Sequence, residues 1–423
     1  MKLQKATISN FKGIQACSLE FRPGFNLIKG ENGKGKTSIL EALAVGLGGY
    51  IAGIDGVKTR HFTKDEVRRV YSRVGEGSYD VAYMLPTQVT LTVDMEDQNG
   101  ILSWTRGMAS IQAARSTLNP RTIARVAEQT ANQKDERLPL LCYQSAARVW
   151  SQKRDKTEDL FGNPYFRTIG YMDALFDASS VKLLLNWCLR MEQIAFQKGK
   201  KIAEYEAVKQ AVSQFMDCIE GRGTHSFFYD KQAESLMYLE NGAVLPISDL
   251  SAGYQSLIWM VFDLAYRMAL LNPALTNHIA ETSGIVLIDE LDMHLHPRWQ
   301  WKVIDALRTT FPNVQFIAAS HAPILFASAK DVWLIDIEGE EIQYSQSHYG
   351  LDISSSVRQF QGRYELPEEI RVLSDQFYSA MDRENYSEAK SILDELKEKT
   401  APAFPLVVDM QTMYEIETAW PEA

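Results

Sequence analysis

The stretch GENGKGKT, residues 30–37, carries a lysine and a hydroxyl side chain at the end of a glycine-rich loop. Its spacing fits the phosphate loop G-x-x-x-x-G-K-[ST], in which glycines let successive backbone N–H groups converge on phosphate oxygens. Lys36 is then expected to supply a compact cation to the terminal phosphates, and Thr37 a hydroxyl to Mg2+. A glycine-rich turn without a ligand is the alternative. The strand expected before the loop and the helix expected after it favour a nucleotide site.

Two adjacent carboxylates, Asp289 and Glu290, end the apolar stretch IVLIDE. Two acids at the end of a buried strand are costly unless a cation or a water molecule pairs with them. We therefore assign Asp289 to the Mg2+ shell and Glu290 to the attacking water, as a general base or water-positioning group. The stretch FIAASH also ends in polar residues, and we expect His321 at its tip to contact the γ-phosphate. A histidine hydrogen-bonded in the core is the alternative.

The stretch DLSAGYQSLIWM, residues 249–260, joins an apolar helical run to a start made of serine, alanine and glycine. A helix N-terminus with Ser251 and Gly253 offers backbone N–H groups to an anion. The phosphate loop already accounts for one triphosphate. A second phosphate-binding element in the same chain therefore suggests that it faces the nucleotide of another copy of the protein.

The side chains that could bind phosphate and Mg2+ must be positioned by the secondary structure. The sequence shows short apolar segments typical of strands that alternate with segments typical of helices. Strands are expected at residues 25–30, 284–290, 314–320 and 331–337, and a helix from about Lys36 to Val45. Such an α/β alternation indicates a mainly parallel sheet.

Other segments complete the expected organisation. Apolar positions at helical spacing predict one or two long helices between about 180 and 220, and the helix that starts with serine, alanine and glycine is expected over 250–271. A β-meander is expected over 226–248 and a further strand over 88–95. The polar stretch at 129–137 is expected to be an exposed loop.

The composition excludes several classes of protein. The chain has 423 residues, of which 45% are hydrophobic and 23% charged, with a net charge of −10. The length allows one large core or two to three domains, and the composition is typical of a globular protein. The net charge argues against a protein whose whole surface coats nucleic acid. Long apolar spans and a secretory leader are absent from the sequence, so we expect a soluble cytoplasmic protein with no membrane contact. The four widely spaced cysteines, Cys17, Cys142, Cys188 and Cys218, disfavour a zinc ribbon and suggest reduced core thiols.

The motifs GENGKGKT, LSAGYQ, IVLIDE and ASH, in this order, resemble the Walker A, signature, Walker B and switch-histidine elements of ABC-type ATPases. The start ISNFKGI and the run DELDMHLHPRWQ are similar to the SMC, RecF and OLD-like branch of that superfamily. The resemblance implies an α/β P-loop NTPase head over 1–350. This head would have a mixed sheet with a parallel core, an antiparallel β-subdomain and a helical subdomain. A C-terminal helical appendage would follow over 351–423. In that superfamily two heads sandwich two ATP molecules, and the signature of each head completes the site of the other.

The resemblance also implies roles for single residues. Gln144 is at the Q-loop position that contacts Mg2+ and senses the γ-phosphate, Lys12 at a basic position near phosphate, and Asp292 at the D-loop position. His294 and His296 are interpreted as structural, with a metal pair as the alternative. The residues assigned to nucleotide binding are Asn32, Gly33, Lys34, Gly35, Lys36, Thr37, Ser38, Ser251 and Gly253; those assigned to catalysis are Glu290 and His321; and those assigned to the metal are Thr37, Asp289 and Gln144.

What the sequence lacks narrows the branch. Roughly 210 residues separate the Walker A and signature motifs, and only about 40 of them read as helical, too few for the long arm of SMC proteins. About 100 residues follow His321 without the Asp-x-Asp pair of an OLD nuclease. The chain is thus similar to the ATPases of antiphage defence, above all the PtuA family of Septu systems, with the PARIS ATPases as close rivals. This implies a slow, regulatory ATPase that forms homodimers or larger assemblies and controls a separate effector nuclease, of HNH type in Septu.

Two alternatives remain at this stage. A RecF-like repair ATPase would bind DNA directly, and the basic stretch at 57–69, with Lys58, Arg60, Arg68 and Arg69, is its best candidate surface. A solvated helix start with mixed charges is the simpler interpretation of that stretch. A scaffold that binds ATP structurally, without turnover, is the other alternative.

Overall fold

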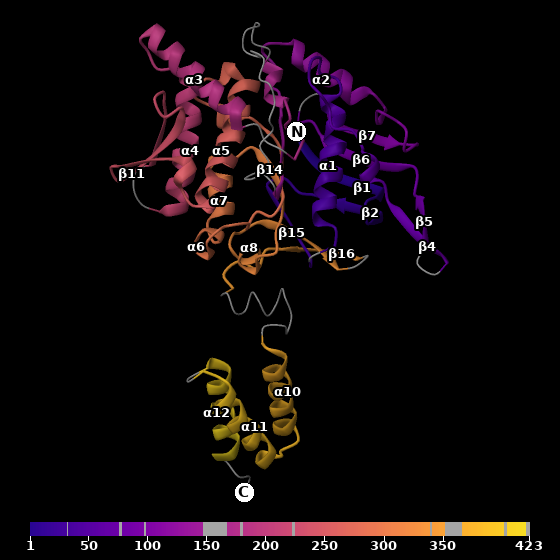
Figure 1. Ribbon diagram of the computed structural model, residues 1–423, viewed down its shortest axis with the longest axis vertical. Helices are drawn as coiled ribbons and strands as arrows, with labels where there is room; N and C mark the ends of the chain where they lie inside the picture. The colour runs from indigo at the N-terminus through magenta and orange to yellow at the C-terminus, as the bar shows by residue number, and fades with distance from the viewer. Residues whose placement is uncertain are drawn as a thin grey trace. The chain divides into compact units, whose positions relative to one another are not determined.

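The protein is described here by a computed structural model, shown in Figure 1. The chain divides into two compact units, Met1–Gly350 and Leu351–Ala423. All the motifs described above lie in the first unit. The structure describes residues 1–31, 33–75, 78–96, 99–146, 167–177, 181–221, 225–338, 341–351, 366–401 and 404–419.

A central, mainly parallel sheet runs through the first unit. Its strands are β3 (Phe25–Lys29), β9 (Leu140–Gln144), β13 (Gly284–Ile288), β14 (Val314–Ala319), β15 (Val332–Glu338) and β16 (Glu341–Gln346). They are arranged in the order β16-β15-β3-β14-β13-β9, and β15–β16 is the antiparallel pair. Every residue of β9, β13 and β14 is buried, which is why these strands read as mostly apolar runs. The parallel core expected from the sequence is confirmed.

The parallel pairing sets the position of the motifs. Because β3, β14 and β13 are parallel neighbours, their carboxyl ends meet at one edge of the sheet. The phosphate loop follows β3 at this edge, Asp289 follows β13, and Ser320 follows β14. Three motif segments that are far apart in the sequence are therefore neighbours in space.

A second, antiparallel sheet covers the helix that follows the phosphate loop. Its strands are β1 (Lys2–Phe11), β2 (Ile14–Glu20), β6 (Thr87–Asp94), β7 (Ile101–Met108) and β8 (Thr117–Asn119), in the order β2-β1-β6-β7-β8. Helix α1 (Lys36–Ile51) contacts both sheets, and every residue from Ile39 to Ile51 is buried. A Cβ atom on Gly49 would lie 2.5 Å from Trp104 Nε1, so glycine lets the sheet approach the helix closely. A helix that is apolar all round is what such a position requires.

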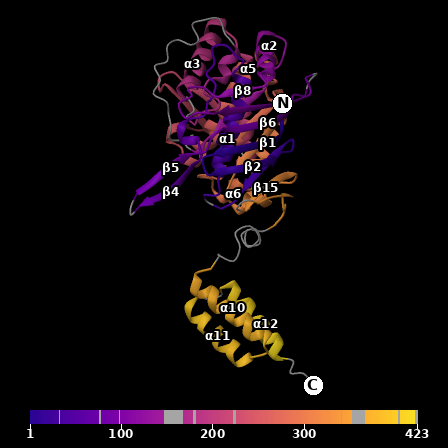
Figure 2. The ribbon, with the colours of Figure 1, turned by 90° about the vertical axis from the view of Figure 1, so that its right-hand side faces the viewer.

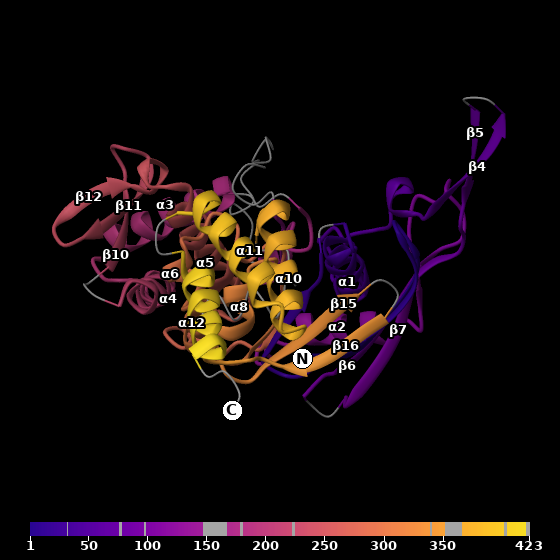
Figure 3. The same ribbon diagram turned by 90° about the horizontal axis from the view of Figure 1, so that it is seen from below.

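A long hairpin leaves the antiparallel side of the first unit. It follows a short 3-10 helix, η1 (Lys64–Glu66), and consists of β4 (Arg69–Gly75) and β5 (Ser78–Tyr83), which pair with each other as a separate two-stranded sheet. Figure 2 and Figure 3 show this hairpin extending away from the neighbouring strands. The sequence did not lead us to expect it.

Helix α2 (Thr122–Asn132) corrects part of the expected loop at 129–137, because residues 129–132 belong to the helix. Its residues Ile123, Val126 and Ala127 are buried, and the helix contacts α1. Apolar residues three and four positions apart thus stabilise a helix whose end is polar.

Helices cover the other face of the central sheet. Helix α5 (Ala252–Leu271) contacts β9 and packs against α4 (Ala203–Glu220) and α3 (Val181–Lys198). The meander consists of β10 (His225–Asp230), β11 (Ser235–Glu240) and β12 (Ala243–Pro246). Asn241 and Gly242 turn between the last two strands with positive φ angles of 49° and 84°, as a tight hairpin turn requires. The shorter helices are η3 (Arg167–Tyr171), η4 (Ile247–Asp249), η5 (Pro273–Leu275), η6 (Ile279–Glu281), α6 (Pro297–Gln300), α7 (Val303–Thr310) and α8 (Pro323–Ala327).

The second unit is built from helices α10 (Glu368–Asp382), α11 (Tyr386–Lys399) and α12 (Pro405–Ala419). Phe377, Ala389, Leu396 and Met410 are among the fully buried residues of its apolar core. In the described part of the chain, none of the helices combines the length and the apolar character needed to span a membrane.

Candidate functional site

The phosphate loop joins β3 to α1 through backbone that only glycine adopts easily. Gly33 and Gly35 have φ angles of 82° and 90°, in the left-handed region, and Gly35 is the N-cap of α1. Asn32, one of the residues assigned to nucleotide binding, lies outside the described residues. The Lys34 side chain is exposed and lies 3.8 Å from the Glu31 carboxylate.

The Lys36 ammonium is held at the mouth of this loop. Lys36 is 6% exposed, and its Nζ donates to the carbonyl oxygens of Gly30 at 2.6 Å and Glu31 at 2.9 Å. It also lies 3.2 Å from His321 Nδ1. Burial lowers the pKa of Lys36, while the acids Asp289, Asp292 and Glu290 act in the opposite direction. The cation therefore stands among carbonyl groups and acids at the end of the sheet.

His321 lies beside the phosphate loop. Burial, and next the charge of Lys36, lowers the pKa of His321, which favours a neutral ring with Nδ1 as the acceptor from the ammonium. Asp292 Oδ1 accepts from Ser320 Oγ and, at 3.4 Å, from the backbone N–H of His321. The structure thus joins the expected D-loop position to the expected switch histidine.

Thr37 and Asp289 contact each other directly. Thr37 Oγ1 donates to Asp289 Oδ2 at 2.9 Å, and Asp289 is 3% exposed. Burial raises the pKa of the Asp289 carboxyl; the Thr37 hydrogen bond lowers it, and the charges of Glu290 and Glu41 raise it. A divalent cation next to this carboxylate would favour its ionised form.

The Thr37 hydroxyl and the Asp289 carboxylate fit Mg2+ better than a metal that takes all its ligands from the protein. A hydroxyl and one carboxylate are hard oxygen ligands, and Mg2+ commonly takes one or two carboxylates and completes its shell with phosphate and water. Within the described residues, the structure contains no group of three or more His, Cys, Asp or Glu that could hold a metal ion.

Glu290 has an unusual backbone conformation. Its φ angle is 45°, in the left-handed region, which is uncommon for a residue other than glycine. Such strain is frequent at functional sites, where the surrounding structure maintains it. The residue lies immediately after Asp289, at the same edge of the sheet.

Sequence reasoning missed Glu41, which lies one helical turn after Thr37 on α1. Glu41 is 8% exposed and forms an ion pair with Lys12, whose φ angle of 47° is also left-handed. Lys12 was expected near phosphate, but the structure pairs it with this acid. A single carboxylate inside the apolar stretch SILEALAVG was the signal in the sequence.

Gln144, which was assigned to the Mg2+ shell, is hydrogen-bonded to an acid in the structure. Its Nε2 donates to Asp263 Oδ2 on α5 at 2.7 Å, and Asp263 also accepts from Arg267 Nε at 3.0 Å. The Gln144 amide is therefore hydrogen-bonded to α5. Thr37, at the start of α1, contacts Asp289.

The Asp263–Arg267 pair leads to a stability prediction. The side chains are 12% and 6% exposed, and Arg267 also donates to the carbonyl oxygen of Gly170 at 2.8 Å. In Asp263→Ala protein the guanidinium stays buried without its carboxylate, so we expect the free energy of unfolding to fall by about 3–5 kcal/mol in urea denaturation. Arg137→Ala, which breaks an exposed pair with Glu281, is the control and should cost less than about 1 kcal/mol. Equal effects of the two substitutions would contradict this account.

The signature residues have their own surroundings. Ser251 is the exposed N-cap of α5, with extended backbone and without a capping hydrogen bond from its own side chain. Gly253 is buried, and a Cβ atom there would lie 2.5 Å from the carbonyl oxygen of His294. Tyr254 stacks edge-on with Trp299 at 4.6 Å. The start of α5 therefore packs on the segment after Asp289 and Glu290, whereas Lys36 contacts the phosphate loop and His321.

The two histidines of DELDMHLHPRWQ have structural contacts. His294 turns the backbone with a φ angle of 63°, and His296 caps α6 by accepting from the backbone N–H of Arg298 at 3.2 Å.

Arg60, from the basic stretch, is 6% exposed and forms a buried ion pair with Glu66 at 3.1 Å. It is therefore removed from the surface expected to bind DNA.

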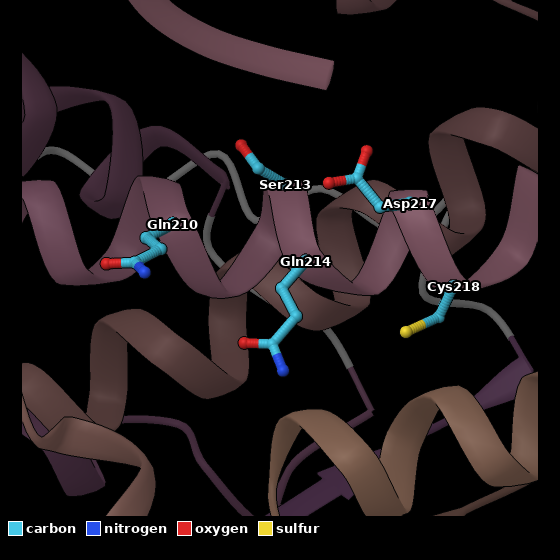
Figure 4. A pocket seen from close by; sticks show the side chains of 5 residues that line it. All are labelled: Gln210, Ser213, Gln214, Asp217 and Cys218. Atoms are coloured by element: carbon cyan, nitrogen blue, oxygen red, sulfur yellow. The ribbon is translucent and has the colours of Figure 1, made fainter. Parts of the chain in front are cut away.

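Two hollows lie away from the motif residues. One of about 530 Å³ is lined by residues of α3, α4 and α5, including Trp187, Lys198 and Leu270. Figure 4 shows the other, of about 430 Å³, where Gln210, Gln214 and Asp217 stand on one helix, α4. None of the described residues that line either hollow belongs to the phosphate loop, the signature or the acid pair.

Comparison with known proteins adds to this geometry. A family model described as an AAA domain matches residues 5–221. The chain is 25% identical over 395 residues to Septu protein PtuA of Bacillus mycoides (strain KBAB4), which covers 89% of this chain and 47% of that protein. It is 46% identical over 90 residues to the Retron Vc95 probable ATPase of Vibrio cholerae serotype O1 biovar El Tor, which covers 21% of this chain and 17% of that protein. The chain thus spans less than half the length of these curated relatives.

Among solved structures, an SMC head bound to the C-winged helix domain of ScpA has a TM-score of 0.51 at 16% identity, covering 82% of this chain and 98% of that chain. This likeness concerns the fold alone, and it confirms the expected α/β head. The expected resemblance to ATPases of the SMC branch and to PtuA is likewise confirmed by these matches.

Proposed function

Because the chain belongs to the family of AAA domains, we propose that it hydrolyses ATP to ADP and phosphate as a regulatory subunit of a bacterial antiphage defence system. One observation carries the ATPase part. Two contacting pairs lie at one edge of the sheet, Lys36 with His321 at 3.2 Å and Thr37 with Asp289 at 2.9 Å, and Glu290 follows Asp289 there.

Each side chain at this edge has a distinct task. Lys36 donates to the terminal phosphate oxygens in place of the carbonyl groups that now hold it. Glu290 accepts a proton from the water that attacks the γ-phosphate. His321, neutral and linked to Lys36, senses whether the γ-phosphate is present. The backbone N–H groups of the glycine loop bind the remaining phosphate charge.

Thr37 and Asp289 would hold Mg2+, which when bound supplies positive charge that neutralises the phosphate oxygens. Thr37 contributes its hydroxyl oxygen and Asp289 a carboxylate already oriented by that hydroxyl. Glu41 lies near Asp289, and its ion pair with Lys12 offsets the negative charge that Glu41 adds beside Asp289.

The site is proposed to be shared between two copies of the chain. The exposed N-terminus of α5 at Ser251 supports this, because its N–H groups offer an anion site apart from the chain's own phosphate loop. Gly253 lets this helix start lie against His294, beside the acid pair. The signature of one copy would thus bind the nucleotide held by the other copy. Through its contact with His294 it would also be linked to the acid pair of its own chain.

A mixing experiment tests the shared site. Ser251→Glu protein keeps its own hydrolytic residues but repels a partner's triphosphate, and Glu290→Gln protein keeps its signature but lacks the base. Each variant alone should be inactive. When the two variants are mixed in equal amounts, about half of the dimers contain one chain of each variant. Each such mixed dimer has one complete site out of two. Up to about a quarter of the wild-type rate of phosphate release should therefore return. A mixture no more active than its components, or a Ser251→Glu protein with normal turnover, would exclude the shared site.

The defence role is supported by the similarity to proteins named as Septu PtuA and as a retron ATPase. We propose that the assembled ATPase holds and controls a separate effector nuclease. The neighbouring gene distinguishes the systems: an HNH nuclease would indicate a Septu-like system, a Toprim protein a PARIS-like one, and a reverse transcriptase a retron.

A further inference from the structure

One face of the β4–β5 hairpin gathers aromatic and cationic side chains. Strand partners in the hairpin are Arg69 with Tyr83, Tyr71 with Val81, and Arg73 with Tyr79. Because directly paired residues, and residues two apart along a strand, point to the same side of a sheet, all these side chains share one face. We call this set the hairpin face; it consists of Arg69, Tyr71, Arg73, Tyr79, Val81 and Tyr83.

The hairpin face is open to solvent. Tyr71 is 59% exposed and Tyr79 is 65% exposed, and the two strands pair with each other alone as a sheet. An isolated two-stranded hairpin is at best marginally stable in water. Here its base is anchored to the head, since the backbone N–H of Arg68 donates to the carbonyl oxygen of Asn10 at 3.0 Å. The tyrosines are therefore presented on a ribbon whose base is anchored, although they add little to a core.

The charge of this face is opposite to that of the chain. The protein carries a net charge of −10, whereas the hairpin face carries two arginines. Lys64 Nζ stands 5.3 Å from the centre of the Tyr83 ring and adds a further cation at the base. Asp80 pairs with Ser72 in the register and so belongs to the opposite face. Asp65 contacts Arg69 in an exposed pair, which is weak in water.

From this arrangement we propose that the hairpin face binds a single strand of nucleic acid. Exposed rings that stack with bases, interleaved with cations that contact phosphates, are the features of surfaces that bind single strands without sequence preference. A stable protein interface needs roughly 20–30 residues a side and a centre depleted of charge, whereas this ribbon offers six side chains with arginines between the rings. The site is separate from the ATP site and extends the proposed function to a nucleic-acid ligand.

Fluorescence anisotropy of the full-length protein with labelled oligothymidylate, or with labelled oligouridylate, of about 20 nucleotides tests the proposal. We expect wild-type dissociation constants of roughly 1–100 µM that weaken with salt, and weaker binding of a duplex of the same length. The DNA and RNA probes show which nucleic acid is preferred. Tyr71→Ala/Tyr79→Ala protein should bind at least about 30-fold more weakly, as the loss of two stacked bases implies.

The controls separate this site from general effects. Tyr349→Ala/Tyr378→Ala protein loses two exposed tyrosines elsewhere and should bind like wild type. Lys36→Ala protein should also keep oligonucleotide binding. The binding result can therefore be interpreted even if the ATPase proposal fails. Thermal melting of each variant confirms folding. The absence of wild-type binding, or equal binding by the hairpin variant, would overturn the proposal, and the face would then belong to a protein partner.

Discussion

Lys36→Ala protein is expected to lose ATP affinity by about 30-fold or more, because a buried, hydrogen-bonded charge contact with a ligand contributes roughly 2–5 kcal/mol. In the structure the ammonium is 6% exposed and already stands at the mouth of the phosphate loop, where it bonds to two carbonyl oxygens. Alanine removes the cation and leaves the negative charge of the phosphates without its partner. Calorimetric titration with ATP and Mg2+ measures the effect directly.

Lys5→Ala protein is the matched control, since Lys5 is an exposed lysine on β1, on a different element from the site. It should bind ATP like the wild type. A Lys36→Ala protein that melts at the wild-type temperature and still binds ATP within about threefold of wild type, a difference under about 1 kcal/mol, would remove the phosphate loop from the proposed mechanism.

Glu290→Gln protein is expected to bind ATP normally but to turn it over about 100-fold to 10,000-fold more slowly, the usual contribution of a general base. The amide keeps the size of the carboxylate but cannot accept the proton of the attacking water. ATP then stays bound, and the shared-site proposal predicts a larger assembly that persists on size-exclusion chromatography with ATP and Mg2+. Single-turnover phosphate release gives the rate of the chemical step.

Glu281→Gln protein controls for the loss of one carboxylate, because Glu281 is 48% exposed and forms a surface pair with Arg137. It should hydrolyse ATP at the wild-type rate and assemble like the wild type. Turnover within about threefold of wild type is too small a change for the loss of a base and would argue against the assigned role of Glu290. Slow turnover without a longer-lived assembly would keep that role but argue against the shared site.

The strand ends that carry the chemistry could be predicted because their signals are local. Buried parallel strands read as apolar runs, and the polar residues that interrupt them at Asp289 and Ser320 mark their carboxyl ends. The phosphate loop is local as well, since its glycines and Lys36 act within one turn of chain. The hairpin was missed because its two strands, which pair only with each other in a separate sheet and have an exposed face, lack the apolar pattern that predicts a strand.

The assignments that came from position in a motif depended on contacts with distant segments. Gln144 ends β9 where a Mg2+ contact was expected, yet its amide bonds to Asp263 because that buried carboxylate needs donors. Lys12 and Arg60 were expected to meet phosphate or DNA, but each is paired with a nearby acid, Glu41 and Glu66. A buried charge finds the partner that the fold provides, and residue spacing does not reveal it.

By itself, the sequence determined that this chain carries a phosphate loop, an acid pair and a glycine-bearing helix start, because each depends on residue types within a few positions. The tertiary structure alone decided which of these groups meet. It brought Lys36 to His321 and Thr37 to Asp289, and it packed Gly253 against His294. The reason is physical: the energy of a buried polar group depends on neighbours supplied by other strands and helices, and only the folded chain sets those neighbours.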